Sequence, residues 1–436
     1  MTVGPELLET SPAAVPPSKR KPRLLSVLGP GLITGASDDD PSGIATYSQA
    51  GSQLGYSITW TMLFSYPLMA VIQEISARIG RTTGRGIAAN VRQHYSNWLL
   101  QSIVLLLFIA NILNIGADLG AMGDALTLLI GGPHLLYVVL FGGVCGLLQI
   151  FMEYSRYVGV LKWLTLALFA YFGTAMVVKI PWGEAALGFL VPTFSSDPAF
   201  WTTVVAILGT TISPYLFFWQ ASQEAEDTKE NPERQPLLKA PRQGPDAIER
   251  IRLDTYIGMA FSNAVALAIM ITTAATLHQA GITDIDSSSQ AAEALRPVAG
   301  PFAFMLFTMG IVGTGLLAVP VLAGSAACAL GEARRWPVGL ARKPKAAKAF
   351  YLTIGTATLI GILINFSPIN PIKALYWSAV INGVVAVPVM AIMMSMAVNP
   401  KVMGKFTIPP LMRVIGWVAT AVMGLAVVGM AVTAWV

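Results

Sequence analysis

Residues 38–40 are three consecutive aspartates that stand directly before Pro41, inside an otherwise apolar segment of residues 24–44. A carboxylate at bilayer depth is energetically costly and indicates a functional role. Proline lacks an amide donor and clashes with the carbonyl four residues earlier, so the helix is expected to unwind there and release the Ser37 carbonyl. An unwound point that offers carboxylate and carbonyl oxygens together is chemically a cation site. Asp40 is the foremost candidate ligand.

A second proline interrupts another apolar segment. Pro214 lies within Gly209-Thr210-Thr211-Ile212-Ser213-Pro214-Tyr215 and, by the same geometry, is expected to free the carbonyl of Thr210. The two broken helices are five helices apart, and an odd number of helices per repeat requires the second repeat to insert upside down. We therefore expect inverted repeats that bring both breaks together near the middle of the membrane, where such transporters bind substrate.

The composition is that of a polytopic membrane protein. The chain has 436 residues, of which 54% are hydrophobic and 12% charged, with a mean hydropathy of +0.63. Eleven apolar segments are long enough to be membrane helices. Their predicted ranges are 24–50 (broken), 56–78, 98–122, 134–152, 159–178, 200–223 (broken), 254–277, 301–330, 349–364, 374–397 and 409–435.

The basic residues define the expected orientation. With the amino terminus in the cytoplasm, all of the 28 Lys and Arg residues except Lys179, Arg296 and Lys373 fall in cytoplasmic segments. An eleventh helix then leaves the carboxyl terminus outside. This distribution explains the positive net charge, so no nucleic-acid partner is implied.

One transmembrane domain follows a short tail. Residues 1–23 are polar and rich in proline and are expected to form a disordered cytoplasmic tail. Residues 24–436 are expected to form a single transporter domain, with one repeat at about 24–178, a second at about 200–397 and an extra helix at about 409–435. The long segment 224–253 is expected to be a flexible cytoplasmic connection.

The first two predicted helices resemble a known family. Asp40-Pro41-Ser42-Gly43 resembles the Asp-Pro-Gly-Asn signature of the Nramp family of divalent-metal transporters, and Gln73-Glu74-Ile75-Ser76-Ala77-Arg78-Ile79-Gly80 is similar to the end of its second helix. The resemblance covers essentially residues 24–436. It implies an all-α membrane protein with LeuT-type five-helix inverted repeats, in which helices 1 and 6 are broken.

Several positions depart from the family pattern. The metal-binding asparagine is Gly43, the family's Met-Pro-His reads Ser213-Pro214-Tyr215, and a second histidine corresponds to Gln220. Asp118 matches an acid associated with proton movement, but the acidic partner of that residue aligns with Ala121. The pattern is similar to that of the Nramp-related magnesium transporters, so the resemblance implies transport that is not coupled to protons.

The expected metal site offers only oxygen ligands. Oxygen suits Mg²⁺, whereas the methionine sulfur that is missing here favours softer transition metals. Successive side chains on a helix point about 100° apart, so at most two of the three aspartates should reach one ion. The small Gly43 and Ser213 are expected to widen the cavity for a hydrated ion. The candidate metal residues are Asp40 first and Asp39 second, with the Ser37 and Thr210 carbonyls, the Ser213 hydroxyl and Gly43.

Other polar residues have two interpretations each. Asp38 either lines the external entrance or pairs with another helix. Asn111, Asn114 and Asp118 recur at helical spacing and either make interhelical hydrogen bonds or line a release path. Glu224 either faces a solvated cytoplasmic exit or takes part in coupling.

The favoured function is a divalent-cation carrier of the inner (plasma) membrane that works by alternating access, prefers Mg²⁺, also carries Mn²⁺ and is not proton-coupled. The alternative within this class is a proton-coupled Mn²⁺/Fe²⁺ importer of ordinary Nramp type. An amino-acid or polyamine carrier would share the fold, but a site for a substrate carboxylate would present amide nitrogens at the break. An enzyme is not expected, because no nucleophile or acid–base pair with recognisable spacing occurs. The expected partners are the ion and the lipid bilayer, without a cofactor and with the protein as a monomer.

Overall fold

A computed structural model describes residues 35, 37–151, 165–231, 233–340 and 342–435, and this part of the chain is built from helices without strands. Its α-helices are α3 (Pro41–Leu54), α4 (Trp60–Thr83), α5 (Ile87–His94), α6 (Asn97–Ile130), α7 (His134–Phe151), α9 (Phe169–Val177), α10 (Trp182–Leu190), α11 (Pro198–Thr211), α12 (Pro214–Glu230), α13 (Gly244–Thr273), α14 (Ser288–Glu293), α15 (Arg296–Ala299), α16 (Ala303–Arg334), α17 (Lys348–Ile364), α18 (Pro371–Ala397), α19 (Pro400–Met403) and α20 (Pro410–Thr433). Short 3₁₀ turns (Gly55–Ile58, Thr165–Leu168, Pro241–Gln243, Gly300–Phe302, Pro344–Ala346 and Gly404–Phe406) and one π-helical turn (Ala274–His278) complete the set.

Proline marks the start of several helices because its fixed φ suits the first helical position and its missing amide is not needed there. Asp40, Asp197 and Asn370 stand before such prolines, and each side chain accepts a hydrogen bond from the first turn of α3, α11 or α18. The prolines that were expected to break long helices thus act as helix starts.

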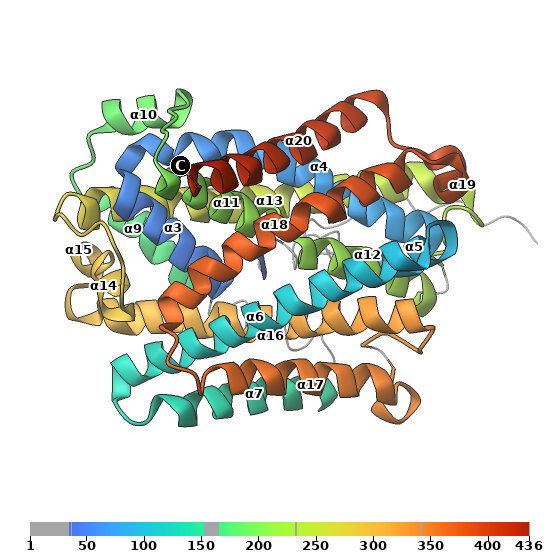
Figure 1. The fold of residues 1–436 in the computed structure, drawn as a ribbon, viewed down its shortest axis with the longest axis horizontal. Helices are drawn as coiled ribbons and strands as arrows, with labels where there is room; N and C mark the ends of the chain where they lie inside the picture. Colours follow the sequence, from blue (N-terminus) through green and yellow to red (C-terminus); the bar gives the residue numbers. More distant parts are fainter. Residues whose placement is uncertain (1–34, 36, 152–164, 232, 341, 436) are drawn as a thin grey trace, which may run out of the picture.

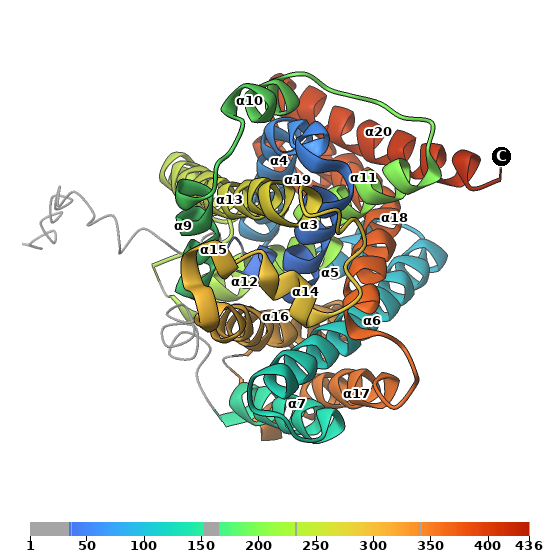
Figure 2. The same ribbon diagram turned by 90° about the vertical axis from the view of Figure 1, so that its left-hand side faces the viewer.

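The long helices form three neighbouring groups. α6, α7, α16 and α17 pack on one another and occupy one edge of the molecule in both ribbon views (Figures 1 and 2). α3, α4, α12 and α13 form the second group, in which α4 contacts both α12 and α13. α11, α18 and α20 pack together on the other side. The first and second groups meet where α16 and α6 face α3 and α12, and the break of each broken helix lies in this zone.

Glycine allows two of these close approaches. A β-carbon on Gly209 of α11 would meet the backbone of Ala379 and Gly383 in α18, and one on Gly35 would meet the backbone of Gly258 in α13. Small residues of this kind let membrane helices approach until their backbones touch. The short piece of helix before Pro41 is therefore held directly against α13.

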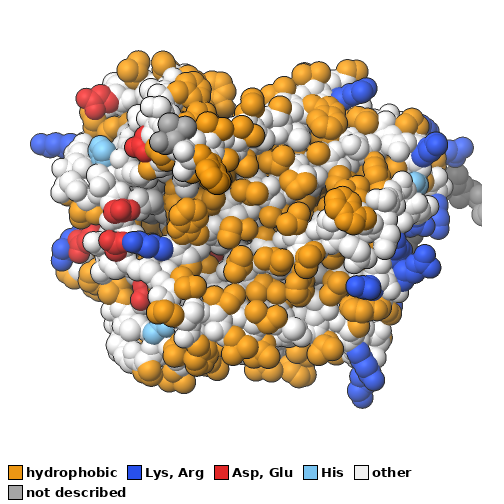
Figure 3. Space-filling view, viewed as in Figure 1, with side chains coloured by type: hydrophobic (Ala, Val, Ile, Leu, Met, Phe, Trp, Pro, Cys, Tyr) orange, Lys and Arg blue, Asp and Glu red, His pale blue; other side chains and the backbone are white. Residues whose placement is uncertain are grey.

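The surface has the pattern of a membrane protein. Seven described helices or helix pairs are long and apolar enough to cross a bilayer, and α17 is a shorter apolar helix. A band of hydrophobic side chains lies between the two ends of the molecule, and most Lys and Arg side chains gather at the end formed by α5 and α19 (Figures 1 and 3). This clustering agrees with the positive-inside pattern, while the absolute orientation remains a prediction.

The predicted all-α transporter fold is confirmed. Eight predicted segments coincide with α4, α6, α7, α13, α16, α17, α18 and α20, and the sixth is split into α11 and α12. Residues 24–34 and 36 of the first segment, residues 159–164 of the fifth and the whole tail 1–23 lie outside the described residues, so the count of eleven and the repeat boundaries remain predictions.

The prediction of a flexible loop over 224–253 is wrong. α12 continues to Glu230 and α13 begins at Gly244, so the connection is short. The backbone amides of Leu237 and Leu238 donate to the carbonyls of Arg81 and Thr82 at the end of α4. These bonds hold the connection against α4.

Candidate functional site

The first helix breaks at the aspartates. Asp38 is the last helical residue before the break, the chain bends at Asp39, and Asp40 is extended with φ −68° and ψ 170°. α3 then starts at Pro41. One carboxylate oxygen of Asp40, Oδ1, accepts from the Gly43 amide at 2.8 Å and from the Ser42 hydroxyl at 2.6 Å. The break thus turns a buried carboxylate into the amino-terminal cap of α3.

The other oxygen of Asp40 faces two different helices. Its Oδ2 atom accepts from the Asn114 amide of α6 at 3.1 Å and lies 3.3 Å from the Tyr215 hydroxyl of α12. The same hydroxyl lies 3.1 Å from the Ser37 carbonyl oxygen, which is the carbonyl that Pro41 was expected to free. The two helix breaks therefore lie against each other, as inverted repeats require.

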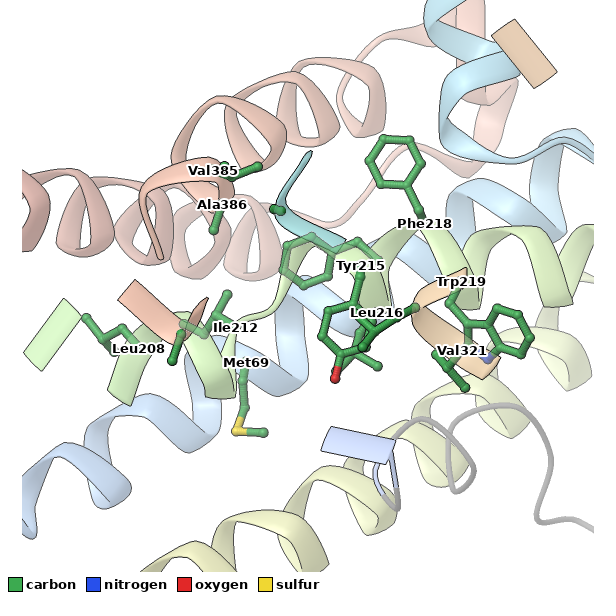
Figure 4. Packing of buried hydrophobic residues seen from close by; sticks show 14 of the residues in the cluster. Met69, Leu208, Ile212, Tyr215, Leu216, Phe218, Trp219, Val321, Val385 and Ala386 are labelled. Carbon is green, nitrogen blue, oxygen red and sulfur yellow. The ribbon is translucent and has the colours of Figure 1, made fainter. Parts of the chain in front are cut away.

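The second break is capped by its own serine. Ile212 leaves the helical conformation at φ −120° and ψ 58°, and α12 starts at Pro214. The Ser213 hydroxyl lies 2.8 Å from the carbonyl of Thr210 and 2.8 Å from that of Gly209, and donates to them. These two predicted ligands are thus bonded to each other in this structure. Figure 4 shows the apolar side chains packed around the break, with Ile212 on one side and Tyr215 on the other.

The other two aspartates point elsewhere. The Ser262 hydroxyl of α13 lies 2.6 Å from Asp38 Oδ2 and 3.0 Å from Asp39 Oδ1. Asp38 therefore pairs with another helix, which was one of its two interpretations. Asp39, predicted as the second ligand, shares this serine, whereas Asn114 and Tyr215 contact Asp40. Within the described part of the chain, no three or more His, Cys, Asp or Glu side chains converge in a metal-holding group.

The space next to Gly43 is filled by neighbours. A β-carbon there would lie 3.1 Å from Thr210 Oγ1 and 3.3 Å from Tyr47 Cε2. The expected widening of the cavity is therefore absent at this position, because Tyr47, which is fully buried, takes up the room. The loss of the family asparagine changes the ligands offered by α3 more than it changes the free volume.

Two predicted acids of the release path have distinct environments. Asp118 is fully buried on α6, and neither carboxylate oxygen has a hydrogen-bond partner among the described residues. Glu224 is also buried and forms an ion pair of 2.6 Å with Arg250 of α13. The interpretation of Glu224 as a solvated exit group is therefore wrong for this conformation, because the guanidinium replaces water around it. Glu74 and Arg78, one turn apart on α4, form an ion pair at 2.5 Å.

The site is closed toward the end that is predicted to be external. Above it, a cavity of about 320 Å³ is lined by Ala45, Gln49 and Gln53, which recur along one face of α3, and by residues of α11 and α18. Five residues separate Ala45 from Asp40, or about 7.5 Å of helix rise. Gln49 also bonds Asp284 and the backbone of residues 283–285, which holds this loop against α3 at the wall of the cavity.

The opposite end is closed by polar contacts between helices. The buried Glu332 carboxylate of α16 accepts from the backbone amides of Gly86 at 3.1 Å and Ala89 at 3.0 Å, at the start of α5. Gln73 of α4 bonds Gln220 of α12 and donates to the Leu216 carbonyl. With Asp40 only 1% exposed, the break is sealed from solvent on both sides.

Sequence reasoning missed three hydrogen-bonding neighbours of the aspartates. Tyr215 was seen only as a lost histidine, although it faces Asp40 and Ser37. Asn114 had an open role, and Ser262 carried no signal beyond being a polar residue in an apolar segment. The recurrence of Asn111, Asn114 and Asp118 on one face of α6 was the signal that could have placed Asn114 at the site.

Comparisons with known proteins give the family. The family model described as natural resistance-associated macrophage protein-like (Nramp) matches residues 31–433. A curated relative from Klebsiella pneumoniae (strain 342), the divalent metal cation transporter MntH, is 27% identical over 67% of this chain and 68% of its own length. The protein of the same name from Burkholderia ambifaria is 25% identical over 92% of this chain and 87% of its own.

Solved structures share the fold. The Eremococcus coleocola manganese transporter matches with a TM-score of 0.72 at 17% identity, covering 92% of this chain and 85% of its own. A nucleobase-cation-symport-1 family transporter in a closed conformation matches with a TM-score of 0.56 at 14% identity, over 94% and 92% of the two chains. From the extent of the family match, this chain belongs to the Nramp family.

Proposed function

We propose that the protein carries divalent metal cations across the membrane by alternating access, with Asp40 as the charged ligand. The observation that carries this proposal is a buried carboxylate at the meeting point of two helix breaks, next to the Ser37 carbonyl and the Tyr215 hydroxyl. Broken helices that present oxygens to a common point are how transporters of this architecture bind cations. The names of the curated relatives, divalent metal cation transporters, support the same substrate class.

The groups around Asp40 support Mg²⁺ as the preferred ion, with Mn²⁺ also carried. Every atom hydrogen-bonded to the Asp40 carboxylate is an oxygen or a nitrogen. The positions of the family asparagine and methionine hold Gly43 and Ser213. Mg²⁺ is usually held through one or two carboxylates and retains several waters, whereas soft metals gain most from sulfur.

The closed state fits one step of the transport cycle. Asp40 is sealed by the Gln49 contacts on one side and by the Glu332 and Gln73 contacts on the other, so the structure is an occluded conformation. Breaking the contacts on one side at a time would expose Asp40 to only that side of the membrane. We assign the end rich in Lys and Arg to the cytoplasm, which places the amino terminus inside and the carboxyl terminus outside.

Transport is uncoupled from protons in this proposal. The residues that replace the family histidines are not bases: Tyr215 faces Asp40, and Gln220 bonds Gln73 and Thr255. Glu224 is fixed by Arg250. The membrane potential supplies roughly 4.6 kcal/mol per 100 mV for a divalent ion, twice the value for a single charge. This is enough to concentrate the ion without a proton gradient.

A proton-coupled Mn²⁺ importer is the second candidate. It is favoured by the manganese transporter among the solved structures of the same fold and by the buried Asp118. Proteoliposomes that contain both a Mg²⁺-sensitive dye and a pH-sensitive dye separate the two. We expect saturable Mg²⁺ influx without acidification. Stoichiometric acidification that is lost in Asp118→Asn would establish coupling, and the absence of any divalent flux would reject the carrier function.

A further inference from the structure

The Asp40 carboxylate is enclosed by polar groups on both of its oxygens. A carboxylate offers about four lone-pair sites. Ser42, Gly43 and Asn114 donate to this one, and the Tyr215 hydroxyl, whose single hydrogen is shared with the Ser37 carbonyl, lies 3.3 Å from Oδ2. An ion that binds Asp40 directly must therefore displace or turn at least one of these groups. Ser42 and Gly43 belong to the first turn of α3 and cap it, so they move only if the helix start is lost. The groups on the Oδ2 side come from other helices and can turn.

Asn114 combines an unused oxygen, which Asn111 also has, with a hydrogen bond to the charged ligand. Its side chain is fully buried, its Nδ2 atom donates to Asp40 Oδ2 at 3.1 Å, and its Oδ1 atom has no hydrogen-bond partner within the described part of the chain. Buried carbonyl oxygens are normally paired, because water would otherwise solvate them. Here the unpaired oxygen belongs to the same amide that already contacts the charged ligand.

A half-turn of this amide would make it a metal ligand. Rotation by about 180° around the terminal bond exchanges the nitrogen and the oxygen, which have nearly the same shape. The oxygen would then lie about where the nitrogen is, 3.1 Å from Asp40 Oδ2. Adjacent oxygens in an octahedron with Mg–O distances of about 2.0–2.1 Å are about 2.8–3.0 Å apart, slightly closer than this. The backbone therefore already holds Asn114 close to the spacing of two neighbouring ligands.

We propose that Asn114 is a switchable ligand of the transported divalent ion: its amide nitrogen holds Asp40 in the empty site, and its amide oxygen binds the ion in the occupied site. The inference rests on the proposed function and adds a ligand from a different helix. Asn114 thereby supplies the amide oxygen that Gly43 cannot, and it does so from α6. The ion would then join α3 to α6, and so link the first and second groups of helices.

Three variants of the full-length protein test this assignment by isothermal titration with Mg²⁺ and Mn²⁺. Asn114→Leu removes both the amide that donates to Asp40 and the oxygen that binds the ion, and is expected to raise the Kd about 10-fold to 100-fold. Asn114→Asp cannot donate but keeps an oxygen ligand, so its Kd is expected at or below the wild-type value. Asn111→Leu is the matched control: Asn111 lies on the same helix, is equally buried and donates instead to the Leu322 carbonyl at 2.9 Å. Its Kd should stay at the wild-type value.

Comparing Asn114→Asp with Asn114→Leu shows whether Asn114 binds the ion itself or only positions Asp40. If Asn114 only holds Asp40 in place, the negative charge of Asn114→Asp would repel Asp40 and weaken binding as much as Asn114→Leu, and the proposal would be wrong. Unchanged binding in Asn114→Leu would also overturn it. If Asn114→Leu does not fold, Asn114→Ser replaces it, because a serine is too short to reach the ion and should show the same loss. Wild-type protein that binds no divalent ion would reject the proposed function itself.

Discussion

Replacing Asp40 with asparagine removes the charge of the site while keeping its shape. The side chain accepts hydrogen bonds on both oxygens. With the amide oxygen toward Ser42 and Gly43, the helix cap is preserved, since asparagine caps as well as aspartate. The new NH₂ group would face Asn114 and Tyr215, both of which can turn to accept. We therefore expect the Asp40→Asn protein to fold, with a thermal midpoint within a few degrees of wild type.

The loss of ion affinity should be large. At an effective dielectric constant of about 20, two unit charges about 4 Å apart attract by roughly 4 kcal/mol, so a divalent ion gains roughly 8 kcal/mol from one carboxylate. Dehydration of the ion opposes most of this gain. If only a quarter, about 2 kcal/mol, remains as net affinity, the Kd rises by about 30-fold when the charge is removed. Transport at ion concentrations near the wild-type KM should then be almost abolished.

The assay is Mg²⁺ uptake by proteoliposomes, and Asp197→Asn is its matched control. Asp197 also precedes a proline and caps its helix, α11, with Oδ1 2.9 Å from the Ala199 amide, but it is exposed and away from the breaks. The control should transport at the wild-type rate. Uptake by Asp40→Asn within about twofold of wild type, at an unchanged KM, would refute the reasoning, because a charge worth even 1 kcal/mol would produce a larger change.

Two further variants probe selectivity and the closed state. In competition assays, the double variant Gly43→Asn with Ser213→Met should shift the ion preference from Mg²⁺ toward Mn²⁺ or Cd²⁺. The variant should lose about 1–3 kcal/mol of stability, because the new β-carbon lies 3.1 Å from Thr210 Oγ1. An unchanged ion preference would show that other residues set the selectivity. Arg250→Met leaves Glu224 buried without its ion-pair partner. This change should lower the free energy of unfolding by about 3–5 kcal/mol. An unchanged thermal midpoint would show that the pair contributes little to stability.

Local chemistry made the helix breaks predictable. Pro41 and Pro214 each forbid an amide hydrogen bond at a fixed place in the chain, so the breaks and the Ser37 carbonyl follow from the residues alone. The 100° step between helix side chains also indicated that the three aspartates could not share one ion. The observed division, with Asp40 toward α6 and α12 and the other two toward Ser262, agrees with that argument.

The partners of these groups depend on tertiary packing and could not be predicted. Spacing placed Asn114 and Asp118 on one face of a helix, but it did not show that this face meets Asp40. Glu224 and Arg250 lie on different helices, and each alone is typical of a solvated helix end. Only the packing of α12 on α13 brings them together as a buried pair. Likewise, the lack of a side chain at Gly43 predicted a wider cavity, but the structure shows that Tyr47 occupies this space.

The position of the bound ion tests the central claim most directly. Crystals of the full-length protein soaked in Mn²⁺, which scatters anomalously, would show the ion as a single peak. The account predicts this peak beside Asp40 Oδ2, within about 2.2 Å of that oxygen and in reach of the Ser37 carbonyl and the Asn114 amide. A peak between Asp38, Asp39 and Ser262 instead, with Asp40 still bonded to Asn114 and Tyr215, would contradict it.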